Sequence, residues 1–487
     1  MTRDFQFISI LATGKDGATK DKAARRQARS HAVKKALEKK RKCQQLSGKN
    51  FTVTTLSQLY TDKDIPKSEA PLSLQVPCQI LGGVLDPFQA LAVDSYRLQI
   101  LLGDHRARQA PEPVFSLADA LAFQSFHSVF RSGFDDPALA NAVMLALAFA
   151  VNGNCGRNVS GTDSTLGLDR ECMRYQGQAI TYIRERMDSV DSAASEATIG
   201  AILLVVGVVA CLGLRDQVEL HMGAVQQLLN ICRERSVYLT PGIKRAIFWQ
   251  DLNASILSGS TRIVTHTTFS ELLWTRDPFV PNFYRLPAGF ECLHLEEEFR
   301  GILKDLHALK CIRDIPKPQK IKANVLLMLS VNNHTANIQS RLVDLDRGEL
   351  SPLQECVRLA AYLCSVMLCC KVWCGLVVPA HISSQLLKEL RALLIQGDRT
   401  LCWTENFDSD PDLITWLLYI GGAFAPLGTV RSGYLDSLQM HCSIADYCSW
   451  SELYKVMKQF IWADDAFLRP VQAFWVEATE RNSKASG

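Results

Sequence analysis

The spacing of apolar residues predicts a chain built mainly from α-helices. Apolar side chains recur every three or four positions from Val114 onward, which places them on one face of a helix. The predicted helices cover residues 117–132, 138–151, 171–187, 196–214, 217–235, 241–257, 296–311, 321–341, 353–377, 383–396, 413–425, 434–442 and 450–460. Alternating strand patterns are scarce. We therefore expect a mainly α fold, an irregular multi-helix bundle or array, with a basic and partly disordered N-terminal arm.

The most apolar stretch, residues 199–214, has no charged side chain over sixteen positions and contains three glycines. A membrane-spanning helix needs about 20 apolar residues. We expect a buried core helix here and no membrane partner. Further along, residues 261–291 hold Pro278, Pro281 and Pro287, which predicts a long loop that crosses the surface.

Charge is unevenly distributed along the chain. The net charge is +3, but residues 1–50 carry 14 basic and 4 acidic side chains, or +10, which leaves −7 for the remainder. Basic residues concentrate in residues 20–42. Nine of them form three groups suited to an import receptor or a phosphate backbone: Arg25, Arg26 and Arg29, then Lys34 and Lys35, then Lys39, Lys40, Arg41 and Lys42. This pattern predicts a polyanion partner or a nuclear-import signal. The alternative is a disordered tail that keeps the protein soluble.

Composition also predicts the domain boundaries. Residues 1–45 form the basic segment, and residues 46–81 form a linker in which Pro66, Pro71 and Pro77 interrupt any helix. The helical body covers residues 82–487. The N-terminus has no apolar run with a cleavage site, so we expect an intracellular protein.

Catalytic and metal-binding patterns are missing. The chain contains no G-x-S-x-G, H-E-x-x-H or G-x-G-x-x-G sequence. Among the sixteen cysteines, the densest group is Cys364, Cys369, Cys370 and Cys374, whose spacing does not match common zinc sites and which lies in an apolar run. We expect packed thiols there, with no catalytic residue, no metal site and no cofactor.

Several stretches resemble the fungal-specific transcription factor domain. They are the F-x-F-I start, Arg29–Ser30–His31, G-G-x-L-D-P-F at 82–88, the apolar helix and M-G-A-V-Q-Q-L-L at 197–229, R-x-x-x-W-x-D within 245–259, and the aromatic segment 460–475. The glycine of the family's H-x-x-G helix falls at Gly223, which alters its spacing. The resemblance implies an α-helical regulatory domain. Many members of that wider family read DNA with an N-terminal binuclear zinc cluster of six cysteines, whereas only Cys43 precedes Cys78 in this chain.

Three hypotheses follow. The first is a nuclear transcription regulator whose helical body binds transcription-machinery proteins, itself or an effector. In this hypothesis the arm binds an import receptor, contacts the DNA backbone without reading bases, or does both. The second is a helical interaction scaffold with a nuclear-import tail and no DNA role. The third is an enzyme with an unrecognised site, which a buried pair of titratable residues would reveal.

Overall fold

The computed structural model describes residues 92–108, 136–151, 169–314, 325–345, 350–369, 377–399, 411–441 and 449–485. All of them belong to the second of the two units into which the chain divides, Leu81–Gly487. The basic segment, the linker, the boundaries at 45 and 81, and the predicted helix at 117–132 lie outside the described residues.

The expected mainly α fold is confirmed, since the described residues form fifteen α-helices and no strand. The first helices along the chain are α2 (Ser95–Arg108), α4 (Pro137–Val151), α5 (Arg170–Met187), α6 (Val190–Ala193), α7 (Glu196–Cys211), α8 (Arg215–Glu234) and α9 (Pro241–Ser258). The later ones are α10 (Glu297–Asp314), α11 (Val325–Asp344), α12 (Pro352–Cys369), α13 (Val377–Arg399), α14 (Pro411–Ala423), α15 (Thr429–His441), α16 (Trp450–Met457) and α17 (Arg469–Ala485).

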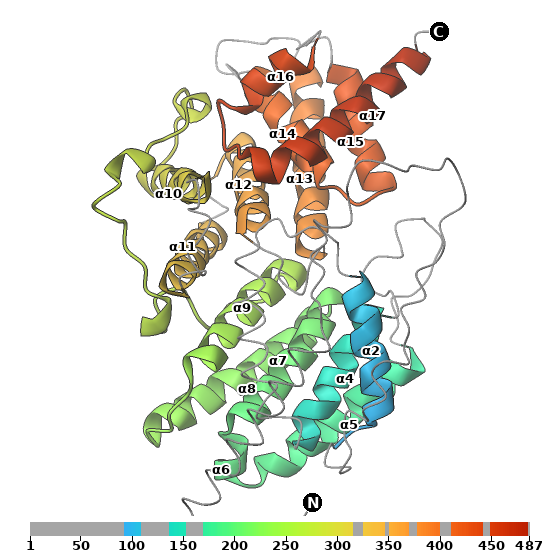
Figure 1. Cartoon of the computed structure of the whole chain (residues 1–487), viewed down its shortest axis with the longest axis vertical. Helices are drawn as coiled ribbons and strands as arrows, with labels where there is room; N and C mark the ends of the chain where they lie inside the picture. The colour runs from blue at the N-terminus through green and yellow to red at the C-terminus, as the bar shows by residue number, and fades with distance from the viewer. Residues whose placement is uncertain are drawn as a thin grey trace, which may run out of the picture. The chain divides into compact units, whose positions relative to one another are not determined.

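Successive helices pack against one another in pairs and triplets (Figure 1). Helix α4 packs on α2, α5 and α7, and α7 packs on α8 and α9. In the later part, α10 packs on α11, α12 on α13, and α14 on both α15 and α17. Helix α9 also contacts α11 and α13, so it joins the earlier helices to the later ones.

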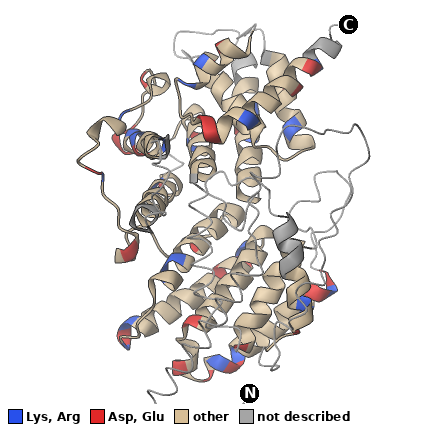
Figure 2. Cartoon of the chain, viewed as in Figure 1, with Lys and Arg blue, Asp and Glu red and all other residues tan. Residues whose placement is uncertain are grey.

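Helix α7 is the buried core helix that the sequence predicts. Every residue from Thr198 to Ala210 except Leu204 is buried, and Figure 2 shows α4 and α7 almost free of charge. The helix ends at Cys211, three residues before the predicted end, because Gly213 takes a left-handed backbone (φ 70°) that closes the turn. No helix in the described part of the chain is long and apolar enough to cross a membrane.

Capping side chains explain why the predicted starts of several helices are accurate. The Asp136 side chain accepts a hydrogen bond from the Leu139 N–H at the start of α4, and the Asp169 side chain accepts one from the Cys172 N–H at the start of α5. Thr240 caps α9, whose first residue is a proline. These polar side chains satisfy amide groups that have no partner inside the helix.

Some predicted helices have the wrong bounds, and other helices were not predicted. The helix expected at 353–377 ends at Cys369, and Val377 begins the next helix, six residues before the predicted start at 383. Pro379 lies in the first turn of α13, where proline is tolerated and marks a new start. Helices α2 and α17 were missed altogether, and α17 follows the π-helical turn Asp464–Leu468 directly.

The loop predicted at 261–291 is correct in having no α-helix but wrong as a simple surface crossing. It contains three short 3₁₀ turns, Ser270–Leu272, Pro281–Phe283 and Ala288–Phe290. Leu272 and Phe290 are fully buried, and the Phe290 ring lies 5.5 Å from Trp416 and 5.2 Å from Phe460 between centroids. The prolines break helices as expected, while these apolar side chains insert the loop into the core.

Candidate functional site

A buried carboxylate on α9 holds the start of the following loop. Gly259 ends α9 in the left-handed conformation (φ 70°), which turns the chain back along the helix. The Asp251 carboxylate then accepts the N–H groups of Ile263 (3.1 and 3.2 Å) and Val264 (3.2 Å). Burial raises the pKa of Asp251, although the Ile263 amide and the nearby Arg262 guanidinium oppose this rise.

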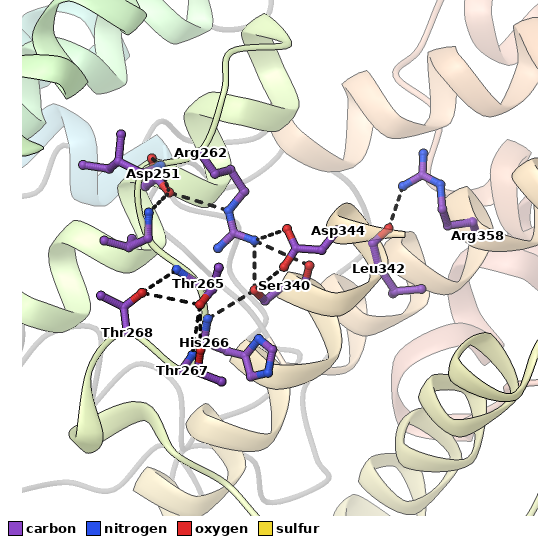
Figure 3. Close-up of polar contacts among 12 residues, drawn as sticks. Asp251, Arg262, Thr265, His266, Thr267, Thr268, Ser340, Leu342, Asp344 and Arg358 are labelled. Atoms are coloured by element: carbon purple, nitrogen blue, oxygen red, sulfur yellow. Dashed lines mark hydrogen bonds and ion pairs between the residues drawn. The ribbon is translucent and has the colours of Figure 1, made fainter. Parts of the chain in front are cut away.

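Arg262 joins this loop to α11 (Figure 3). Its Nη1 donates to Ser340 Oγ (2.8 Å) and Asp344 Oδ1 (2.9 Å), and its Nε lies 3.6 Å from Asp251 Oδ2, an ion pair too long for a hydrogen bond. Its guanidinium carbon lies 5.7 Å from the centre of the Phe248 ring. The nearly buried side chain therefore bridges acids from two helices.

Arg245, on the same helix as Asp251, holds a second point of the loop. Its Nη1 donates to the side-chain oxygens of Asn332 (2.7 Å) and Asn333 (2.6 Å) on α11, and its Nη2 donates to the Glu271 carbonyl (2.6 Å). The neighbouring Lys244 forms an ion pair with the Glu271 carboxylate. Burial lowers the pKa of Arg245, while Glu271 acts in the opposite direction.

A third set of ion pairs ties the loop to α10. Asp305 is almost fully buried. Its carboxylate forms ion pairs with Arg276 Nε from the loop and with Arg341 Nη1 from α11, each at 2.7 Å. Arg341 Nε also donates to Glu298 at 2.6 Å. One carboxylate thus receives two guanidinium groups from different parts of the chain, a charge-assisted arrangement.

Two histidines with lowered pKa values lie beside these charges. His334 stacks on Trp274 with centroids 3.8 Å apart and planes at 10°, and burial lowers its pKa to about 3. Burial also lowers the pKa of His266, whose backbone N–H donates to Ser340 Oγ (3.3 Å). The lowered pKa values favour the neutral form of both imidazoles, which adds no charge to the cluster.

We call this cluster the polar clamp. It comprises the cations Lys244, Arg245, Arg262, Arg276 and Arg341 and the carboxylates Asp251, Glu271, Glu298, Asp305 and Asp344. Five positive charges match five negative ones. The two buried carboxylates, Asp251 and Asp305, each lie beside a guanidinium group, an arrangement that holds a conformation. The clamp fixes residues 262–276 against α9, α10 and α11.

The cysteines whose side chains the structure describes, which do not include Cys369, are free thiols. Burial raises the pKa of Cys356 to about 12 and also raises that of Cys364, which favours the unreactive thiol form of both. Cys370 and Cys374 lie outside the described residues. In the part of the chain that is described, no three His, Cys, Asp or Glu side chains are close enough together to hold a metal ion.

The nine basic residues predicted to contact an import receptor or phosphates all lie outside the described residues, so the structure brings none of them together. Conversely, the sequence pattern gave no reason to single out Arg262, Asp305 or Arg341. Only Arg245 and Asp251 were marked, through the R-x-x-x-W-x-D pattern, and both belong to the polar clamp.

Comparison of the chain with protein-family models, curated proteins and solved structures finds no match in any of the three. The resemblance to the fungal-specific transcription factor domain therefore stays a prediction.

Proposed function

We propose that this protein is a nuclear regulator of transcription that acts by recruitment and not by catalysis. The helical body binds transcription-machinery proteins or a second copy of the chain. The basic arm, residues 20–42, binds an import receptor and contacts the DNA backbone. No cofactor, metal ion or membrane takes part.

The observation that carries the proposal is the segregation of charge. Eleven Lys or Arg and two acids stand in residues 20–42, while residues 51–487 carry a net charge of −7. A single basic segment on a mildly acidic body directs phosphate contact to the arm and leaves the body to other partners. Phosphate contacts position a protein on a duplex but do not read its sequence. We therefore assign the choice of DNA targets to the proteins that bind the helical body.

The polar clamp supports a binding role for the body. Its charges are balanced, two of its carboxylates (Asp251 and Asp305) are buried, and they hold a proline-rich loop in one conformation against three helices. A binding surface benefits from such preorganisation, because less conformational entropy is lost when a partner binds.

Deletion of residues 20–42 tests the proposal when nuclear entry is restored by an unrelated import signal. Chromatin association of this variant should fall well below that of the intact chain, measured as the fraction retained on chromatin after a salt wash. A control variant carries the unrelated signal together with the intact arm. If the deletion variant is retained as well as this control, the arm has no DNA role and the interaction-scaffold hypothesis is favoured.

A further inference from the structure

The loop held by the polar clamp exposes an aromatic side chain. Phe279 is 91% exposed, the largest exposed fraction among the large hydrophobic side chains of the described residues. Leu273 on the same loop is more than half exposed, and Pro278 and Pro281 are exposed on either side of the Phe279–Val280 pair. Large apolar side chains grouped on a surface mark binding sites.

The turn that carries Phe279 is preorganised. The Asp277 carboxylate accepts the Phe279 N–H (2.9 Å), and the Asp277 N–H donates to the Tyr284 hydroxyl (2.9 Å). The N–H groups of Phe283 and Tyr284 donate to the carbonyls of Val280 (3.0 Å) and Pro281 (3.1 Å). An aromatic residue on such a turn binds without the cost of ordering a loop.

Both ends of this turn are fixed to the body. Arg276 pairs with buried Asp305 and lies over the Tyr284 ring, 5.6 Å from its centre. The Phe283 carbonyl accepts a hydrogen bond from His307 Nδ1 on α10 (2.9 Å). The exposure of Phe279 is therefore imposed by packing and ion pairs on either side of it.

The loop that carries Phe279 has two charged side chains of opposite sign, Asp277 and Arg285, that no described residue neutralises. The second oxygen of the Asp277 carboxylate and the exposed Arg285 guanidinium have no hydrogen bond or ion pair with any described residue. An apolar centre with one free acid and one free base is complementary to itself. A two-fold axis at Phe279 would allow Asp277 of each copy to face Arg285 of the other while the Phe279 rings pack together.

We propose that residues 273–285 form a contact surface for a second copy of this chain. The dimer is weak, because one aromatic ring and a few smaller side chains bury a few hundred Å² per copy, whereas a stable interface buries about 800 Å² per partner. This contact deepens the proposed function, in which a second copy of the chain is one partner of the helical body. The two can fail separately, because dimerisation is measured on the purified chain without DNA or nuclear entry.

Sedimentation equilibrium of the full chain tests this contact between about 1 and 200 µM, a range suited to a weak dimer. The mean mass should rise from 54.2 kDa toward twice that value. Phe279→Ser should weaken dimerisation at least about tenfold, as expected for a central aromatic anchor. The matched control is Leu427→Ser, which removes another exposed apolar side chain (82%) from a turn between α14 and α15. It should leave dimerisation unchanged.

Charge variants test the pairing across the axis. Arg285→Glu should weaken dimerisation about fivefold, because two carboxylates then face each other. Asp277→Asn retains an acceptor for the Phe279 N–H, and in the Arg285→Glu background it should strengthen dimerisation by removing that repulsion. A chain that stays monomeric at 200 µM would overturn the proposal. So would equal effects of the Phe279 and Leu427 changes, or charge effects that simply add.

Discussion

Replacement of Arg262 by alanine is the sharpest perturbation of the polar clamp. Asp251 is 2% exposed, so the variant leaves a buried carboxylate with only two backbone N–H groups as partners. Removing one partner of a buried ion pair costs about 3–5 kcal/mol. Asp344, at 39% exposure, regains water and adds at most about 1 kcal/mol. We expect a loss of about 3–4 kcal/mol in the free energy of unfolding at pH 7, the lower part of that range, because the N–H groups still stabilise Asp251.

The loss should shrink at acidic pH. The folded-state pKa of Asp251 is already raised by burial, and removal of the guanidinium raises it further. Between the unfolded and folded pKa values the folded state binds more protons, so stability falls as pH rises, by up to about 1.4 kcal/mol per pH unit. The variant should therefore lose less relative to the original chain at pH 5 than at pH 7.

Urea unfolding followed by circular dichroism measures these losses. The control is Arg215→Ala, which breaks an exposed i,i+4 pair with Glu219 in which the arginine side chain is 56% exposed. Its loss in the free energy of unfolding should be small, because an ion pair in water stabilises little. A loss for Arg262→Ala within about 1 kcal/mol of the control, or a loss that grows as pH falls, would refute the reasoning.

Two further predictions concern packing and thiol reactivity. Gly422→Ala should destabilise the protein by about 3 kcal/mol, since the added methyl group overlaps the fully buried Phe474 ring. Gly223→Ala has open space around it in α8 and should stabilise the protein by up to about 1 kcal/mol. Equal urea midpoints for the two variants would contradict this. In native protein, iodoacetamide should label exposed Cys292 while sparing buried Cys356, whose pKa burial raises to about 12, and Cys364. Site-resolved mass spectrometry checks this, and labelling of all three at one rate would show the reasoning to be wrong.

The helices were predictable where local signals define them. Asp136–Pro137 and Thr240–Pro241 place cap and proline together at helix starts, and the apolar period gives the length. Helix α17 was missed because Arg469–Pro470 follows a π-helical turn without a polar cap. The split between α12 and α13 was missed because apolar residues continue past Cys369.

The polar clamp was not predictable in the same way. Arg262 pairs with Asp344 and Arg276 with Asp305, partners 82 and 29 positions away in the chain. No local period or cap specifies such pairs, because tertiary packing decides which charges meet. The exposure of Phe279 is also a tertiary property, since Phe290 on the same loop is fully buried.

Salt-dependent binding to two unrelated DNA duplexes tests the central proposal most directly, with imaging of the same proteins in cells. If about five arm charges neutralise phosphates, the slope of log affinity against log salt should be about −4.5 for both duplexes. Changing Lys39, Lys40, Arg41 and Lys42 to alanine should make this slope less negative and weaken both complexes equally. The same change should shift the protein toward the cytoplasm. Unchanged nuclear location of this variant, with salt-independent binding to one preferred duplex, would contradict the account and move DNA recognition into the helical body.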